Sequence, residues 1–86
     1  MSQIEIYTTH TCPYCHAAKE LLERKGAAYA EINVAGDPQA RSAMSARANG
    51  RTSVPQIFID GRHVGGCDDL YALEEAGDLD PLLAAR

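Results

Sequence analysis

Hydrophobic and polar residues alternate in two short stretches of the first third of the chain, residues 4–7 and residues 30–34. Alternation of this kind predicts strands with one face packed on a core. Between them, residues 13–25 carry apolar side chains at helical spacing, and Gly26 stands where the helix should end. A loop over residues 8–11 joins the first strand to this helix. The order predicts a right-handed βαβ unit with parallel strands.

A second and weaker helix is predicted over residues 37–49. Asp37 suits the N-cap of this helix, and Pro38 suits its first helical position. A continuous apolar run follows at residues 57–59, and such a run is typical of a strand covered on both faces. The middle of the chain therefore predicts a helix and then a central strand.

The last third of the chain predicts a hairpin and one further helix. The pair Asp60-Gly61 is a hairpin turn before a short strand around residues 63–64. Asp68 and Asp69 precede helical spacing over residues 70–76, and Gly77 ends this helix. Asp80-Pro81 then opens a last turn that packs Leu79, Leu82 and Leu83.

The predicted order of elements is β-α-β-α-β-β-α, in a single domain that spans residues 1–86. A mixed four-stranded sheet with helices on both faces would bury the apolar positions of all these elements. This α/β arrangement is that of the thioredoxin fold.

Composition excludes some classes of partner and indicates the cellular compartment. The chain has a formal net charge of -4, and its acidic excess lies in residues 52–86. Nucleic acids and anionic membranes require clustered Lys and Arg, so neither is an expected partner. No window approaches the roughly 18 apolar residues of a membrane-spanning helix, and the first residues lack the pattern of a secretory signal. We therefore expect a cytoplasmic protein.

Three cysteines are present, an odd number that does not suit a secreted disulfide framework. Cys12 and Cys15 form a Cys-x-x-Cys motif where the first predicted helix begins. The unpaired N–H groups and the dipole of a helix start favour a thiolate at Cys12. Cys15 lies one turn further in, within reach of Cys12, and should be more buried and less acidic. The motif predicts an attacking thiol at Cys12 and a resolving thiol at Cys15.

Two other interpretations of these cysteines are possible. His63 and Cys67 could complete a Cys₃His zinc site with the Cys-x-x-Cys pair. The pair could also consist of packed, inert thiols. Redox chemistry is favoured over both, because Cys-x-x-Cys beside a βαβ unit in a cytosolic chain is a thioredoxin-like pattern.

Two segments further along the chain are candidates for binding. Pro55 could simply start the following strand through a trans bond. If the Val54–Pro55 bond is cis, it would turn the Val54 backbone toward the Cys12 loop, where it could pair with an extended peptide. The N–H groups of Cys67 and Asp68, at a helix start, would suit a carboxylate, and the Asp68 side chain would suit an ammonium group. Alternatively, Asp68 or Asp69 is a plain helix cap, and Cys67 is a small buried residue.

Taken together, three separated motifs resemble the glutaredoxin family, and the similarity covers essentially the whole chain. They are Cys12-Pro13-Tyr14-Cys15, Thr52-Ser53-Val54-Pro55 and Gly65-Gly66-Cys67-Asp68-Asp69. The resemblance is closest to the bacterial dithiol members.

This resemblance implies a glutathione-dependent disulfide oxidoreductase with Cys12 as nucleophile and a cis Val54–Pro55 bond. Glutathione would be a co-substrate, with no bound cofactor and no metal, and the partners would be disulfide-containing or glutathionylated proteins. We expect a monomer. The implied glutathione groove is formed by Tyr14, Ser53, Val54, Pro55, Gly66, Cys67 and Asp68.

The chain departs from the family pattern at two positions. Many glutaredoxins have a lysine three positions before the nucleophile, where this chain has Thr9. The remaining candidates for the missing cation are His10, Arg41 and Arg47. Ser53 stands where the family usually has Thr, which matters little for a backbone contact.

Two rival functions remain open from the sequence. The first is a protein of glutaredoxin shape that thioredoxin reductase reduces, which the Cys67-Asp68 pair argues against. The second is a carrier of zinc or of a cluster. Pro13 and Tyr14 differ from the Cys-Gly-Phe-Ser type that holds iron–sulfur clusters, so a cluster is not expected.

Overall fold

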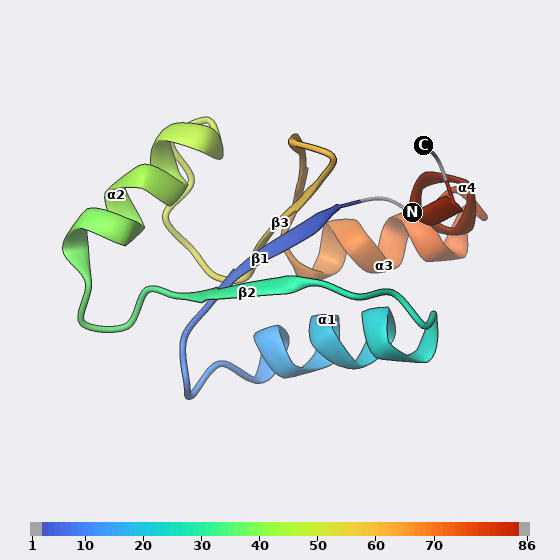
Figure 1. Ribbon diagram of the computed structural model, residues 1–86, viewed down its shortest axis with the longest axis horizontal. Coiled ribbons are helices and arrows are strands. Elements are labelled where there is room, and N and C mark those ends of the chain that lie inside the picture. Colours follow the sequence, from blue (N-terminus) through green and yellow to red (C-terminus); the bar gives the residue numbers. More distant parts are fainter. Residues whose placement is uncertain (1–2, 85–86) are drawn as a thin grey trace.

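A computed structural model describes residues 3–84 of the chain as a four-stranded sheet with four helices (Figure 1). The order of strands across the sheet is β2-β1-β3-β4. The strands are β1 (Ile4–Thr8), β2 (Ala30–Asn33), β3 (Gln56–Ile59) and β4 (Arg62–Gly65). The helices are α1 (Pro13–Arg24), α2 (Pro38–Arg47), α3 (Cys67–Glu75) and α4 (Leu79–Ala84).

The strand pairing confirms the predicted mixed sheet. β1 pairs in parallel with β2 and antiparallel with β3, and β3 pairs antiparallel with β4. Asp60 and Gly61 both adopt positive φ, 53° and 79°, which the two-residue turn between β3 and β4 requires. The central strands β1 and β3 therefore have a neighbour on each side, whereas β2 and β4 are the edges.

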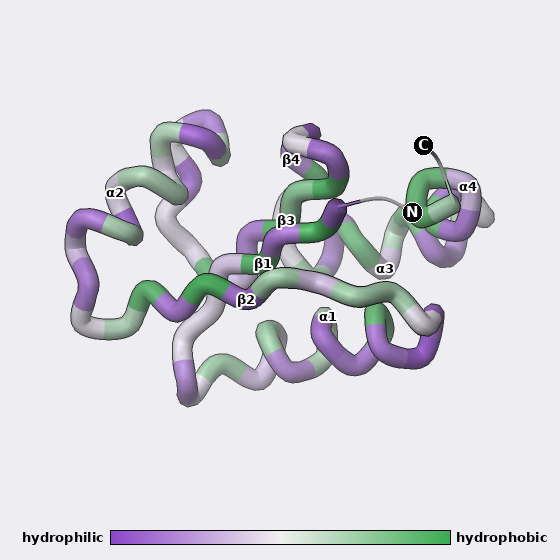
Figure 2. The backbone as a smooth tube through the Cα atoms, in the orientation of Figure 1, coloured by the Kyte–Doolittle hydropathy of each residue, from purple (hydrophilic) through white to green (hydrophobic). Residues whose placement is uncertain are grey.

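Two hydrophobic clusters cover the two faces of the sheet. Ile57 and Ile59 of β3 face α1, α3 and α4, whereas Phe58 faces α2, because neighbouring side chains of a strand point to opposite faces. Figure 1 shows α1 and α3 together on one side of the sheet and α2 on the other. Figure 2 shows α1 turning its hydrophobic positions toward the strands. The run at residues 57–59 is buried on both faces, as predicted.

Local capping explains where the helices begin, and it corrects part of the prediction. The Asp37 side chain accepts a hydrogen bond from Ala40 N at 3.0 Å, so the predicted cap of α2 is confirmed. The N-cap residue of α3 is Gly66, and the Asp69 side chain caps this helix start by accepting a hydrogen bond from Gly66 N at 2.9 Å, so the interpretation as a helix cap is confirmed for Asp69. The last element is a six-residue helix, not a turn opening at residue 80, and it begins at Leu79, which is buried.

The β2 edge also differs from its prediction. Ala30 is exposed, and Val34 lies beyond the last residue of β2 although its side chain is buried. β2 places few side chains in the core, so it does not need strict alternation of hydrophobic and polar residues. Between residues 3 and 84, no helix combines the length and the hydropathy needed to cross a membrane.

Candidate active site

Cys12 is the N-cap residue of α1, and its sulfur caps the helix. Its backbone is extended, with φ -97° and ψ 107°, and its Sγ accepts a hydrogen bond from Cys15 N at 3.1 Å. N–H groups at a helix start lack partners within the helix, and together with the helix dipole they favour a negative charge on the group they contact. The fold therefore places the Cys12 sulfur at the helix end where unpaired N–H donors gather.

Cys15 is the buried member of the pair. Its side chain is fully buried, whereas Cys12 is 9% exposed. Burial, followed by the hydrogen bond with the Cys12 side chain, raises the pKa of the Cys15 thiol to about 12. Cys15 therefore keeps its proton at neutral pH and can donate a hydrogen bond to a thiolate at Cys12.

The loop before β3 brings a backbone carbonyl to Cys12. The Val54–Pro55 peptide bond is cis, as the family resemblance implied. The Cys12 thiol donates to the Val54 carbonyl oxygen across 3.6 Å. The two residues are 42 positions apart in the chain, so this contact joins the Cys-x-x-Cys motif to the second family motif.

A buried amide holds this loop. Gln56, the first residue of β3, is fully buried. Its Nε2 donates to the Ser53 carbonyl oxygen at 3.0 Å and to Ser53 Oγ at 3.3 Å, and its Oε1 lies 2.7 Å from His63 Nε2. Both ends of the amide therefore have partners, which ties the Ser53 backbone to the sheet.

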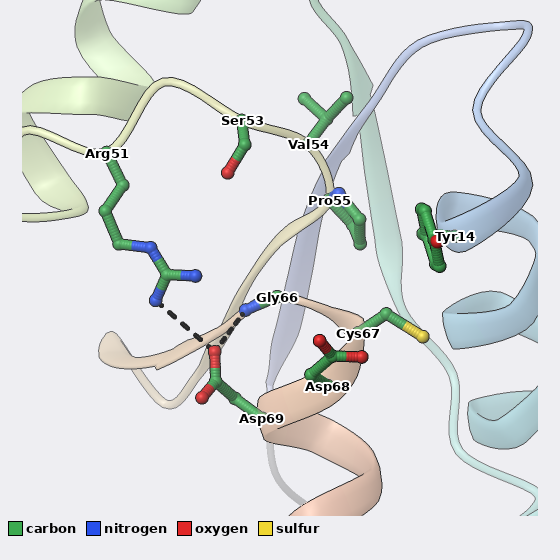
Figure 3. A pocket seen from close by; sticks show the side chains of 9 residues that line it. All are labelled: Tyr14, Arg51, Ser53, Val54, Pro55, Gly66, Cys67, Asp68 and Asp69. Atoms are coloured by element: carbon green, nitrogen blue, oxygen red, sulfur yellow. Dashed lines mark hydrogen bonds and ion pairs between the residues drawn. The ribbon is translucent and has the colours of Figure 1, made fainter.

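The loop, the start of α1 and the start of α3 together line a cavity of about 160 Å³. Figure 3 shows Arg51 and Tyr14 on opposite sides of it, with Pro55 and Gly66 between them. The lining residues are Tyr14, Arg51, Ser53, Val54, Pro55, Gly66, Cys67, Asp68 and Asp69. All seven residues predicted from the resemblance to form a groove lie in this lining.

The start of α3 is held by a carboxylate from its own first turn. Asp69 Oδ2 accepts a hydrogen bond from Gly66 N at 2.9 Å, and it lies 3.3 Å from Arg51 Nη1 (Figure 3). The Gly66 hydrogen bond, followed by Arg51, lowers the pKa of Asp69. Gly65 has φ +122°, and a Cβ at that position would overlap the Asp69 carboxylate, so only glycine fits.

Cys67 is the first residue of α3, one position after the N-cap, whereas Cys12 is itself the N-cap residue of α1. The two are equally exposed, at 9%, and burial, followed by the charge of Asp68, raises the pKa of the Cys67 thiol. The structure has three free cysteines, at positions 12, 15 and 67. A protonated Cys67 contributes packing and a backbone N–H to the cavity, which agrees with its interpretation as a small buried residue.

The sequence analysis missed Arg51. Its three candidate cations all lie outside the cavity lining: His10 is 3.5 Å from Asn33, Arg41 donates to the Thr52 carbonyl oxygen, and Arg47 holds Glu5 and the Tyr7 hydroxyl. Its position in the sequence could have indicated this role, because Arg51 lies two residues before Ser53, which was already predicted to line the groove.

The zinc interpretation gains no support from the side-chain positions. Among residues 3–84, no three or more His, Cys, Asp or Glu side chains gather as metal ligands. His63 Nε2 instead pairs with Gln56 Oε1. The side chain that would complete a Cys₃His set therefore serves the hydrogen-bond network behind the cavity.

Comparison with known proteins agrees with this geometry. A sequence model of the glutaredoxin family matches residues 4–64. Glutaredoxin 3 of Escherichia coli is 58% identical over 83 residues, which cover 96% of this chain and 99% of the relative. The solution structure of glutaredoxin from Brucella melitensis is 55% identical, with a TM-score of 0.85, and the match covers 96% of this chain and 89% of that one.

A more distant structure has the same architecture. The crystal structure of a buckwheat glutaredoxin–glutathione complex matches with a TM-score of 0.85 at 30% identity, covering 95% of this chain and 76% of that one. The fold is the thioredoxin fold, and with the Cys-x-x-Cys motif at a helix start it defines the class of thiol–disulfide oxidoreductases. Within that class, this chain belongs to the glutaredoxin family.

Proposed function

We propose that this protein is a glutathione-dependent thiol–disulfide oxidoreductase that reduces protein disulfides and glutathione mixed disulfides. Cys12 is the nucleophile and Cys15 the resolving thiol. The observation that carries the proposal is the position of the Cys12 sulfur, which caps α1 and contacts the Val54 carbonyl beside a cavity that ends at the start of α3.

Glutathione has groups that complement the two sides of this cavity. Its γ-glutamyl α-carboxylate would accept hydrogen bonds from the Cys67 and Asp68 N–H groups, and the Asp68 carboxylate would pair with its ammonium group. The Val54 backbone would pair with the cysteinyl residue, between Tyr14 and Pro55. The glutathione complex of the buckwheat relative supports this assignment by analogy.

The removal of glutathione from a protein takes two successive thiol–disulfide exchanges. The Cys12 thiolate attacks the glutathione sulfur of a glutathionylated protein, forming a Cys12–glutathione disulfide as the protein thiolate leaves and takes up a proton. A second glutathione thiolate then attacks the glutathione sulfur of this disulfide, releasing oxidised glutathione and regenerating Cys12. Binding at the cavity holds the reacting sulfur in place, which makes the attack nearly unimolecular.

Protein disulfides need the second cysteine. Cys12 attacks the disulfide and forms a mixed disulfide with the target protein. Cys15 then loses its proton and attacks Cys12, which releases the reduced target and leaves a Cys12–Cys15 disulfide. Two glutathiones reduce this bond and leave as oxidised glutathione. The raised pKa of Cys15 keeps it protonated until Cys12 is engaged.

The proposal includes the setting in which the protein acts. It functions as a single-domain monomer in the cytoplasm with no resident cofactor, and glutathione is supplied from solution. The reducing power comes from glutathione reductase through glutathione.

Variants of the two cysteines test this proposal. In an assay coupled to glutathione reductase, Cys15→Ser should still remove glutathione from a glutathionylated protein but no longer reduce a protein disulfide. Cys12→Ser should lose both activities. If Cys15→Ser kept both, Cys15 would not be the resolving thiol. Turnover with thioredoxin reductase but none with glutathione would replace the proposal with its rival.

A glutathione titration followed by NMR tests the groove separately from the chemistry. Shifts centred on the backbone amides of Tyr14, Val54 and Asp68 are expected. Shifts centred on α2 instead would contradict the assignment of this cavity to glutathione.

A further inference from the structure

The cavity carries an unequal set of charges. Asp68 and Asp69 contribute two carboxylates to its lining, and Arg51 is the one cationic side chain that lines it within the described residues 3–84. Glutathione has two carboxylates and one ammonium group at neutral pH. An acidic cavity that binds an anionic peptide needs a cation, and this arginine is the group the cavity provides.

Arg51 is held in place but only partly used by the protein. Its Nη1 lies 3.3 Å from Asp69 Oδ2, an oxygen that also accepts the Gly66 N–H at 2.9 Å. Within the described part of the chain, Asp69 is the sole ion-pair or hydrogen-bond partner of this guanidinium. The side chains of Arg51 and Asp69 are 46% and 47% exposed. The second nitrogen, Nη2, therefore remains able to bind an anion from solvent.

The free nitrogen lies at the start of α3. A Cβ placed on Gly66 would stand 3.7 Å from Arg51 Nη2 and 3.4 Å from the Pro55 carbonyl oxygen. Because Gly66 is a glycine, this space between the loop and the helix is left open. A carboxylate at that point would meet the guanidinium on one side and the first N–H groups of α3 on the other.

We propose that Arg51 binds the γ-glutamyl α-carboxylate of glutathione and so makes the site selective for substrates that carry it. This inference rests on the proposed function. Asp69 acts as a positioning residue: it holds Nη1 and the Gly66 N–H with one oxygen, so that Nη2 and the start of α3 face the same ligand group. The glycine carboxylate at the other end of glutathione does not contact Arg51.

Substrate analogues combined with substitutions test which carboxylate Arg51 binds. The substrates are three mixed disulfides of cysteine: with glutathione, with 4-aminobutyryl-cysteinyl-glycine, which lacks the γ-glutamyl α-carboxylate, and with glutathione amidated at glycine. The measured quantity is kcat/KM for each mixed disulfide. In a reaction made of two successive exchanges, kcat/KM for the mixed disulfide reports the first exchange, in which that disulfide binds and reacts with Cys12.

Arg51→Gln should lower kcat/KM for the glutathione disulfide by about tenfold, the lower end for a charge-assisted hydrogen bond because the side chain is half exposed. The same loss is expected with the glycine amide, whereas the 4-aminobutyryl analogue should change by less than about twofold. Arg51→Lys keeps the charge but loses the planar fork, so a smaller loss of about threefold is expected.

Two further variants separate this contact from general effects. Arg62→Gln removes the same charge from an exposed arginine of β4 that does not line the cavity, and it should leave all three rates unchanged. Gly66→Ala fills the open space without backbone strain, because φ of Gly66 is -94°. It should lower kcat/KM for glutathione and its amide more than for the 4-aminobutyryl analogue.

The outcomes separate a failure of the role of Arg51 from a failure of the proposed glutathione-dependent activity. An equal effect of Arg51→Gln on all three substrates, or an effect that disappears with the glycine amide, would overturn the role of Arg51. The wild-type protein then still prefers glutathione disulfides over cystine, and the proposed function stands. A wild-type protein without that preference would overturn both.

Discussion

The helices α1 and α3 both begin beside the cavity and both carry a cysteine at their start, but the two starts differ in what satisfies their N–H groups. At α1 the Cys12 sulfur is the cap, and no acidic residue lies in the first turn. At α3 a carboxylate of Asp69 takes the Gly66 N–H, and Asp68 and Asp69 both lie in the first turn. A sulfur therefore contacts the N–H groups at the start of α1, whereas carboxylates surround the start of α3.

This difference indicates that the start of a helix does not by itself lower the pKa of a cysteine, because the pKa of Cys67 is raised there. Cys12 is the N-cap residue, so its sulfur contacts an N–H of the first turn directly. Cys67 is as buried as Cys12 but comes one position after its N-cap and has Asp68 as its neighbour. Burial, followed by the charge of Asp68, raises the pKa of its thiol. We therefore expect the position of the sulfur and the sign of the nearest charges to decide which cysteine reacts. The α3 start remains available for a ligand.

The largest expected difference between the two starts is catalytic. Cys12→Ser should lower the rate of glutathione mixed-disulfide reduction by more than about a thousandfold, because it removes the proposed nucleophile. Cys67→Ser retains the backbone N–H, so its loss should not exceed about threefold. The measurement is the glutathione reductase-coupled rate. Comparable losses in both variants would mean that the Cys67 sulfur takes part in the reaction.

The second difference concerns the contribution of Asp69 to the free energy of unfolding and its dependence on pH. The lowered pKa of Asp69 means that its contribution to stability is present above its ordinary value of 3.8 and is lost as the pH falls through the lower folded value. Asp69→Asn should therefore reduce the free energy of unfolding at pH 7 by about 1 kcal/mol, the size of a helix-capping contact. Near pH 2 the variant and the wild-type protein should be equally stable.

Urea unfolding at the two pH values measures this, with Asp68→Asn as the matched control. Asp68 is exposed and adjacent on the same helix, but the Gly66 N–H binds Asp69. Its substitution should have a smaller effect at pH 7. A loss at pH 7 that persisted unchanged at low pH would contradict the charged role of Asp69.

The smallest expected effect comes from placing an acidic residue in the first turn of α1, where α3 already has two. His16 is exposed and is the fourth residue of α1, so His16→Glu adds a negative charge beside the helix start. The thiolate at Cys12 should become less favourable, and the alkylation rate of Cys12 at pH 7 should fall by about threefold. His16→Gln adds no charge and is the control. A rate unaffected by Glu would show that local charge does not govern Cys12.

The sequence predicted those parts of the fold that depend on neighbouring residues. The Asp37 cap, the Asp60-Gly61 turn and the buried run at residues 57–59 were all predicted correctly, because each rests on local backbone preference or on strand periodicity. The α4 helix was missed: it begins at buried Leu79, so Asp80 and Pro81 lie in its first turn and not before it.

The candidate site was predictable only in part. The Cys-x-x-Cys pair and the two later motifs were evident from sequence and family resemblance, and the cavity lining contains all the predicted groove residues. The Arg51–Asp69 pair was not, since its members are 18 positions apart and meet only because the β3–β4 hairpin folds between them. Arg47 does not line this cavity, because its guanidinium stacks on Phe58 and binds Glu5 and the Tyr7 hydroxyl.

The most direct test of the account is the relative alkylation rate of the three cysteines at pH 7, measured by mass spectrometry of the reduced protein. Cys12 should be modified first, because the raised pKa of Cys67 and of Cys15 keeps both of those thiols protonated. A Cys67 rate equal to or faster than that of Cys12 would contradict the claim that the start of α1 provides the reactive sulfur.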